Sequence, residues 1–297
     1  MSAVLSSPDD VQPLPAQHTR GYWASVGARF LRDPVAVAAA VVVLLLVLLA
    51  VFGPWLAPAD PYQSSMFKRL KPVGTPGLPL GSDELGRDLL SRLIVGARLS
   101  LFMGITPVLC AFAIGSGIGI LAGYAGGLVN TAIMRTIDVL YAFPSVLLAI
   151  ALSGTLGAGI ANSLISLTIV FIPQIARVAE AVTTQVRGRD YVEAARASGA
   201  GGFTIVKVHV LGNVLGPIFV YATSLVAVSM ILASGLSFLG LGVKPPEPEW
   251  GLMLNTLRTA IYTQPLVAAL PGAMIFITSI TFNLLSDGLR SAMDNKT

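Results

Sequence analysis

This sequence of 297 residues is poor in charged, cysteine and histidine side chains. Only 11% of its residues are charged, against about 25% in typical soluble domains, which excludes a protein whose whole surface faces water. The single cysteine, Cys110, excludes an intrachain disulfide and a cysteine-based metal site, and we expect it to serve as a small packing residue. The two histidines, His18 and His209, cannot assemble a histidine-based triad or metal cluster within a membrane span.

Nucleotide-binding and catalytic signatures are also missing. A Walker phosphate-binding loop requires a lysine directly after a glycine, and none of the five lysines follows one. We therefore expect no catalytic residues, no cofactor and no metal in this chain. The net charge of +4 and the isoelectric point near 9.4 fit a membrane protein whose basic residues flank its spans, so we expect the lipid bilayer as a partner and no nucleic acid.

Hydrophobic residues are abundant, at 54% of the chain, and they are gathered in long runs without charges. From Pro34 to Ala59 no residue is ionisable, and such a run can cross about 30 Å of hydrocarbon as one helix. The run between Asp138 and Arg177 is too long for one helix, and its central glycines divide it in two. The runs predict an all-α integral membrane protein with six transmembrane helices, at residues 35–57, 99–124, 132–153, 160–179, 214–240 and 265–286.

The spans also predict an organisation across the membrane. Arg20, Arg29 and Arg32 precede the first span, and basic residues favour the cytoplasmic side. Six spans then place both termini and the loop at 183–212 in the cytoplasm, although the external loop also carries basic residues. The expected parts are a cytoplasmic tail at 1–33, a first transmembrane helix at 34–58, an external loop with an amphipathic helix at 59–98, a core of five transmembrane helices at 99–287, and a second cytoplasmic tail at 288–297.

Two features inside the predicted spans concern packing. Gly115, Gly119 and Gly123 recur every fourth residue on one helical face, which lets two helix backbones approach closely in lipid, although glycine is also common in membrane helices generally. Asp138 lies inside a span, where an ionisable group is costly. Arg135 lies three residues earlier on the same face, and we favour a local ion pair near the cytoplasmic interface over a proton relay.

A charged stretch, EAARASGAGGFTIVKVHVLGN at 193–213, interrupts the apolar runs. Asp190 and Glu193 have the spacing of a capping box, and Gly199 suits the residue after a helix C-terminus. We therefore expect a short helix from Asp190 that ends before Gly199. One narrow face of this helix has small side chains and one aromatic, at Tyr191, Ala194, Ala195 and Ser198.

The segment after the glycines, VKVHV at 206–210, alternates like a strand. No second strand is predicted nearby to pair with it, and an isolated strand is not stable. We expect a short helix that leads into the fifth span, so that the whole stretch protrudes into the cytoplasm as a helix, a glycine turn and a second helix. An ordinary amphipathic connecting loop explains the charges but not the small-residue face.

The stretch resembles the EAA loop of ABC importer permeases, in Glu193, Ala194, Ala195, Gly199 and the pair Val210–Leu211. It departs from that family at Gly212, where a proline is usual. Four segments resemble the second permease subunit of dipeptide and oligopeptide importers, whose relatives carry glutathione or nickel chelates: LGSDELGRDLLSRLIVGARLSL at 80–101, RDYVEAARASGA at 189–200, LSFLGLGVKPPEPEWGLML at 236–254 and FNLLSDGLRSAMD at 282–294.

The resemblance implies a type I ABC importer permease fold in a bacterial inner membrane. It implies four kinds of partner: a homologous second permease subunit, two ATP-binding subunits that carry ATP and magnesium, an extracytoplasmic solute-binding protein, and the bilayer. The residues expected to dock on an ATPase subunit are Asp190, Tyr191, Glu193, Ala194, Ala195, Arg196, Ser198 and Gly199. Pro245, Pro246 and Trp250 are expected to form an external gate or binding-protein dock, or else a rigid interfacial loop.

An ion-coupled secondary transporter is the alternative from another class. Such a protein commonly shows paired intramembrane acids, broken helices around ion sites or internal repeats. None of these is evident in the sequence, which favours the importer permease for dipeptides or oligopeptides, with glutathione or a nickel chelate as alternative substrates.

Overall fold

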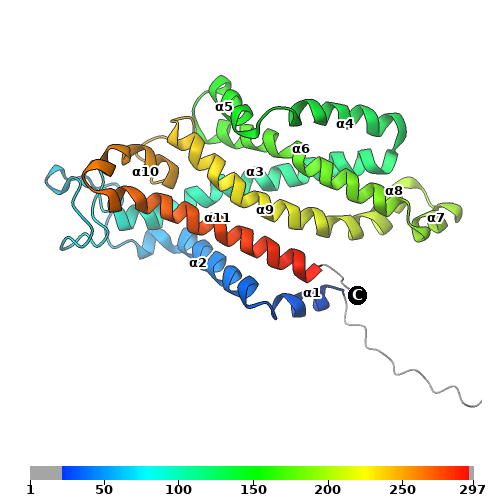
Figure 1. The fold of residues 1–297 in the computed structure, drawn as a ribbon, viewed down its shortest axis with the longest axis horizontal. Coiled ribbons are helices and arrows are strands. Elements are labelled where there is room, and N and C mark those ends of the chain that lie inside the picture. The colour runs from blue at the N-terminus through cyan, green and yellow to red at the C-terminus, as the bar shows by residue number, and fades with distance from the viewer. Residues whose placement is uncertain (1–21, 294–297) are drawn as a thin grey trace, which may run out of the picture.

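The computed structural model describes residues 22–293, so most of the predicted N-terminal tail and the last four residues lie outside the described residues. The described chain is a long bundle of helices without β-strands (Figure 1). Five helices are long and apolar enough to cross a membrane, and a bent pair makes a sixth span if it is counted as one. The long ones are α2 (Pro34–Leu56), α3 (Leu89–Ala125), α6 (Ile160–Arg187), α9 (Leu211–Phe238) and α11 (Pro265–Met293).

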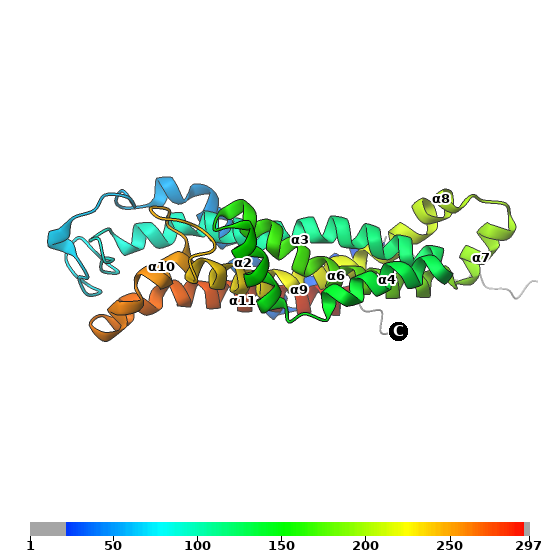
Figure 2. The same ribbon diagram turned by 90° about the horizontal axis from the view of Figure 1, so that it is seen from above.

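Shorter elements connect these spans, some at the ends of the bundle and others along its side (Figures 1 and 2). They are α1 (Tyr22–Phe30), α4 (Gly127–Tyr141), α5 (Ser145–Leu156), α7 (Asp190–Ala197), α8 (Gly202–Ile205), a π-helical turn (Val206–Val210) and α10 (Trp250–Thr256), with 3₁₀ turns at Met66–Lys68 and Arg258–Tyr262. The loop before α3 and α10 lie at one end of the bundle, and α7 and α8 lie at the other.

The first span begins where the sequence predicts. The Asp33 carboxylate accepts hydrogen bonds from the backbone nitrogens of Val35 and Ala36, at 2.9 and 3.2 Å, and Pro34 occupies the first helical position. A proline there loses no hydrogen bond, because that N–H has no partner within the helix. The 23 residues of α2 extend about 35 Å, enough to cross the hydrocarbon layer.

The second span is longer than predicted, because α3 begins at Leu89 and not near residue 99. The Asp88 carboxylate caps this helix by accepting from the Ser91 N–H at 2.9 Å. Arg92 and Arg98, which precede the charge-free run, are therefore helical residues. The amphipathic helix expected within 59–98 is the first part of α3, and the preceding loop contains only the 3₁₀ turn at Met66–Lys68.

The third span was expected to be one helix at 132–153, and this expectation is wrong. Helices α4 and α5 are separated by a short break and are bent by 84°. Pro144 lies in the break, and a proline disfavours helical backbone at the residue before it, here Phe143. The pair forms one face of the molecule, beside α6 (Figure 1).

The core lies among α3, α6, α9 and α11. The glycine stripe of α3 faces α6, as its spacing predicts. A Cβ atom on Gly115 would lie 2.9 Å from the Ile172 carbonyl oxygen, and a Cβ atom on Gly123 would lie 2.7 Å from the Glu180 carbonyl oxygen. A Cβ atom on Gly119 would overlap the Ala176 carbonyl oxygen. Only glycine permits this approach of the two backbones. Cys110 of the same helix is exposed at the surface of the bundle.

Candidate functional site

Helix α7 lies beyond the end of the bundle, joined to the last residues of α6 (Figure 2). Its N-cap is Arg189, and Asp190 is already the first helical residue. The predicted capping box is therefore wrong, because no side chain bonds the free N–H groups of the first turn. Asp190 and Glu193 instead place two negative charges in that turn, where they stabilise the positive end of the helix dipole.

The C-terminal end of α7 is closed as predicted. Gly199 has a φ of 83°, in the left-handed region that favours glycine. The Gly199 N–H donates to the Arg196 carbonyl at 3.0 Å, and the Ala200 N–H donates to the Ala195 carbonyl at 3.1 Å. These two bonds form a Schellman motif, which satisfies the last carbonyls and reverses the chain direction.

One face of α7 is anchored and the other is free. Val192 is fully buried, and Ala195 packs beside the hydrophobic core. Of the eight predicted docking residues, only Ala195 is partly buried. The small-residue face therefore contacts the protein at Ala195 and is exposed elsewhere. The seven that are exposed are Asp190, Tyr191, Glu193, Ala194, Arg196, Ser198 and Gly199.

The VKVHV segment is helical, as predicted, and forms a π-turn that continues into α9. Its inward residues Ile205 and Val210 are buried, while Phe203 and Val208 are 82% and 61% exposed. Large apolar side chains on a protruding element mark an interaction surface. The predicted site omitted these two residues, although their position in an apolar run at the tip could have indicated them. Gly212 lies within continuous helix, and a Cβ atom there would meet open space.

The base of α7 is braced against the corner between α3 and α4. The Asn130 side-chain amide donates to a Glu180 carboxylate oxygen at 2.7 Å and to the Ala122 carbonyl at 3.2 Å. The Arg187 guanidinium lies directly against Gly126, where any side chain would clash with it. This brace ties the last turns of α6, which precede α7, to the bundle.

The ion pair predicted for Asp138 has a different main partner. Arg177 of α6 contacts the Asp138 carboxylate at 2.5 Å, whereas Arg135 is 3.8 Å away. The Arg177 guanidinium also stacks over the Tyr141 ring, 4.5 Å from its centre. The bond joins the end of α4 to α6 next to the α4–α5 break.

Comparison with known proteins identifies the family. Residues 115–297 match the family described as the binding-protein-dependent transport system inner membrane component, and residues 21–72 match the N-terminal transmembrane domain of oligopeptide transport permease C. The chain belongs to this permease family. It is the permease subunit of an ABC importer, a multi-pass protein of the bacterial inner membrane that works with ATPase and binding-protein components. Because the chain belongs to this family, the alternative function of an ion-coupled secondary transporter is rejected.

Relatives resemble this permease over almost their whole length. The glutathione transport system permease protein GsiD of Pectobacterium atrosepticum (strain SCRI 1043) is 43% identical over 274 residues, which cover 92% of this chain and 91% of the relative. GsiD of Escherichia coli O157:H7 is 43% identical over 296 residues, covering 99% and 96%.

Solved structures support the fold. Two crystal forms of the MetNI methionine ABC transporter in inward-facing conformations are 18% identical to this chain, with TM-scores of 0.57 and 0.56. The first alignment covers 69% of this chain and 97% of that one, and the second covers 67% and 95%. At this identity the likeness concerns the fold alone.

At the end of the bundle opposite α7, the prolines and the tryptophan of the predicted gate or dock are separated. Pro245 and Pro246 are exposed, whereas Trp250 is fully buried. The Trp250 backbone N–H donates to the Ser100 hydroxyl at 3.0 Å. Trp250 therefore anchors the loop to α3 and offers no surface to a binding protein in this conformation; the role of the two prolines stays a prediction.

Sequence reasoning missed a buried charged cluster that shapes this end of the permease. Asp83 accepts from Arg87 at 2.5 Å and lies 3.3 Å from the Arg92 guanidinium, with all three side chains buried. Arg92 also donates to the carbonyls of Pro61, at 2.9 Å, and Pro246, at 3.4 Å. One arginine of α3 thus contacts two loops at this end of the bundle. The segment LGSDELGRDLLSRL contains these residues, but their mutual contact is not readable from spacing.

Glu249 is a second buried acid near this cluster. Its carboxylate caps α10 by accepting from the Gly251 and Leu252 N–H groups, both at 2.8 Å. Burial raises the pKa of Glu249 above its ordinary value, and these backbone hydrogen bonds oppose the shift. Within residues 22–293, no three metal-ligating side chains are grouped, so the chain offers no candidate metal centre there.

Proposed function

We propose that this permease forms half of the translocation path of an ATP-driven importer of short peptides, with glutathione among them. A homologous permease subunit forms the other half, and a solute-binding protein delivers the peptide from outside. Two ATPase subunits bind ATP and magnesium and contact the two permeases from the cytoplasm. The match to an oligopeptide permease domain and the name of the GsiD relatives support this substrate class.

The observation that carries the proposal is the construction of α7. It is a short helix with a closed C-terminal end, one buried face and a second face that no residue among 22–293 covers. The exposed Phe203 lies on the element that follows it and extends the free surface. Such a short helix suits binding in a groove on another protein, because a segment that is already folded loses little conformational entropy when it binds.

The connections of α7 to α6 and α9 also indicate how a movement of the ATPase is transmitted to the translocation path. The first end of α7 continues from α6 after a two-residue turn, and its second end leads through α8 and the π-turn into α9. Both α6 and α9 pack on α3 in the core. An ATPase that displaces α7 would therefore tilt two core helices together and switch the path between inward-facing and outward-facing states.

The orientation follows from the same geometry. Helix α1 and the end of α11 lie toward the end of the bundle that carries α7 (Figure 1). If α7 meets the ATPases in the cytoplasm, both termini lie there too. Arg29 and Arg32, next to the start of α2, agree with this orientation because basic residues favour the cytoplasmic side.

Transport by the reconstituted complex tests this function. The permease, its partner permease and the ATPases are placed in liposomes, and the binding protein is supplied outside with labelled dialanine or glutathione. We expect uptake of at least one of the two, dependent on ATP and on the binding protein. A complex that imports neither, or that imports either one with an ion gradient and no ATP, would disprove the proposal.

A further inference from the structure

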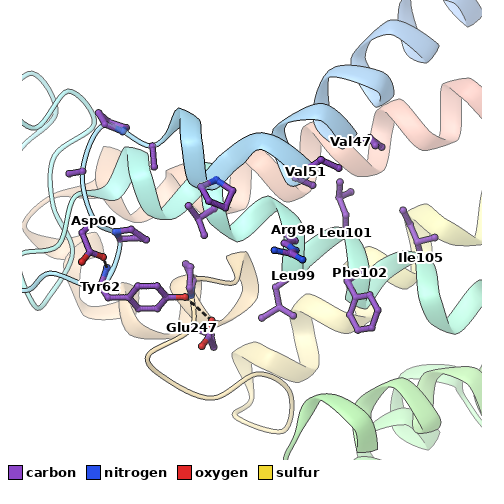
Figure 3. Close-up of a pocket in the computed structure, with 18 of the residues that line it drawn as sticks. Val47, Val51, Asp60, Tyr62, Arg98, Leu99, Leu101, Phe102, Ile105 and Glu247 are labelled. Carbon is purple, nitrogen blue, oxygen red and sulfur yellow. Dashed lines mark hydrogen bonds between the residues drawn. The ribbon is translucent and has the colours of Figure 1, made fainter.

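A groove of about 1110 Å³ opens at the external end of the bundle, far from α7. Its floor is apolar, formed by Val47 and Val51 of α2 and by Phe102 and Ile105 of α3 (Figure 3). Its rim is the external segment Pro58–Tyr62 together with Glu247 and Pro248. The groove therefore combines an apolar floor with a polar rim, as small-molecule sites commonly do.

Arg98 is the one cation among the residues that line this groove. Its side chain is exposed, and Figure 3 shows it amid the lining residues of α3. Within residues 22–293, its guanidinium forms no ion pair or hydrogen bond, whereas Arg87 and Arg92 both contact Asp83. A guanidinium on a membrane helix is costly unless an anion or water meets it. Arg98 is thus available for an anionic group from outside the chain.

Two carboxylates line the same groove. Glu247 accepts a hydrogen bond from the Tyr62 hydroxyl at 2.9 Å, and Asp60 accepts one from the Tyr62 N–H at 2.8 Å. Neither acid lies within ion-pair distance of a basic residue in the described part of the chain. The pKa of Tyr62 is raised by partial burial and by its bond to Glu247, which keeps this hydroxyl a donor at neutral pH.

We propose that the groove binds a short zwitterionic peptide at the external mouth of the path, with Arg98 holding its carboxylate and Glu247 and Asp60 holding its ammonium group. The proposal rests on the proposed function, which supplies the peptide. Arginine binds a carboxylate through two parallel hydrogen bonds, which makes it well suited to this role. The apolar floor receives the peptide side chains, and the volume is sufficient for two or three residues.

A zwitterionic phospholipid headgroup carries the same pair of charges. The structure favours the peptide because both acids of the groove come from the segment Pro58–Tyr62 and from Glu247, whereas the helix faces below contribute apolar side chains, Thr106 and Arg98. The experiment therefore measures both ligands.

The test uses the complete complex in liposomes, with the binding protein and labelled dialanine outside. Arg98→Gln is expected to reduce dialanine uptake about tenfold or more, because a charge-assisted contact is lost. Arg98→Lys should retain part of the uptake. The matched control is Arg258→Gln, which changes another exposed arginine, outside the groove. Assembly with the partner subunits and basal ATP hydrolysis should remain at wild-type level in all three variants.

A direct contact assay accompanies transport. A dipeptide that carries a photoreactive benzoylphenylalanine side chain should cross-link to segments 47–62 or 98–106 in the wild-type complex, and less in Arg98→Gln. Glu247→Gln should lower the cross-link of the free dipeptide but not that of its N-acetyl form, which has no ammonium group to bind.

Three results would overturn the groove assignment. The first is wild-type dialanine uptake by Arg98→Gln. The second is loss of bound phosphatidylethanolamine from Arg98→Gln, seen by native mass spectrometry, with unchanged peptide cross-linking. The third is loss of the partner permease on purification of the variant, which would make the groove a subunit interface. If the wild-type complex imports neither dialanine nor glutathione, the proposed function fails instead.

Discussion

The indole nitrogen of Trp250 donates a hydrogen bond to the backbone carbonyl oxygen of Leu93 at 3.0 Å, across 157 positions of sequence. Trp250 is fully buried, so this bond and the surrounding packing fix α10 to the start of α3. We predict that Trp250→Phe destabilises the permease by about 1–3 kcal/mol, from a lost buried hydrogen bond and a cavity. Thermal unfolding in detergent measures the change.

Trp55→Phe is the control for that substitution, because Trp55 is 78% exposed on α2. It should leave the unfolding temperature within about a degree of wild type, since most surface changes fall within about 0.5 kcal/mol. Equal unfolding temperatures for the two variants would show that Trp250 does not anchor α10 to α3.

The contact of α3 with α6 gives a second prediction. Gly119→Ala places a methyl group into the Ala176 carbonyl, and we expect a loss of about 1–3 kcal/mol from overpacking. Gly117→Ala is the matched control on the same helix, because a Cβ atom there meets nothing within 4 Å. The control should be neutral or slightly stabilising. We expect a lower unfolding temperature for Gly119→Ala than for Gly117→Ala, and equal temperatures or the reverse order would contradict the prediction.

The closure of α7 gives a third prediction. Gly199→Ala forces an alanine into a left-handed conformation, which costs about 1 kcal/mol and loosens the Schellman motif. Gly201→Ala is the control two residues away, where φ is −67° and no atom is close. Binding of the ATPase subunits, measured by co-purification, should weaken in Gly199→Ala only. Equal yields from both variants would contradict the role of the motif.

The raised pKa of Glu249 predicts that the stability of the permease depends on pH. Its pKa is higher in the folded permease than its ordinary value of 4.5, so the folded state binds more protons between the two values. Stability contributed by Glu249 is therefore present at low pH and is lost as pH rises from its ordinary pKa through the raised one. The difference in unfolding free energy between wild type and Glu249→Gln should fall with rising pH in that window. A flat difference would show that burial does not shift this carboxyl group.

The apolar runs were sufficient to predict the class of fold and most spans, because a membrane helix must be long and free of charge. The same rule misplaced the start of α3, since it set the boundary at Arg98, whereas Arg92 lies within the helix, buried against Asp83 and carbonyl groups. The break between α4 and α5 was also missed. Pro144 gave a local signal for it, but the surrounding apolar residues continue through the break without interruption.

The helix that carries the proposed docking residues was predictable in position and less so in detail. The short helix and its end at Gly199 depend on local backbone preferences, which can be inferred from the sequence. The anchoring of Val192, the π-turn and the exposure of Phe203 depend on contacts between separate helices. The groove around Arg98 depends on them even more, because its lining comes from α2, α3 and two separate loops.

The central claim is that α7 transmits ATP hydrolysis to the path, and Glu193→Arg tests it most directly. The Glu193 side chain is exposed on α7, so a charge reversal there leaves the fold and membrane insertion intact. Asp287→Arg makes the same reversal at another exposed acid, on α11, and serves as the control. The measurement is ATP hydrolysis by the reconstituted complex, with and without peptide-loaded binding protein. We predict that stimulation is abolished in Glu193→Arg and retained in Asp287→Arg; wild-type stimulation in Glu193→Arg would contradict the account.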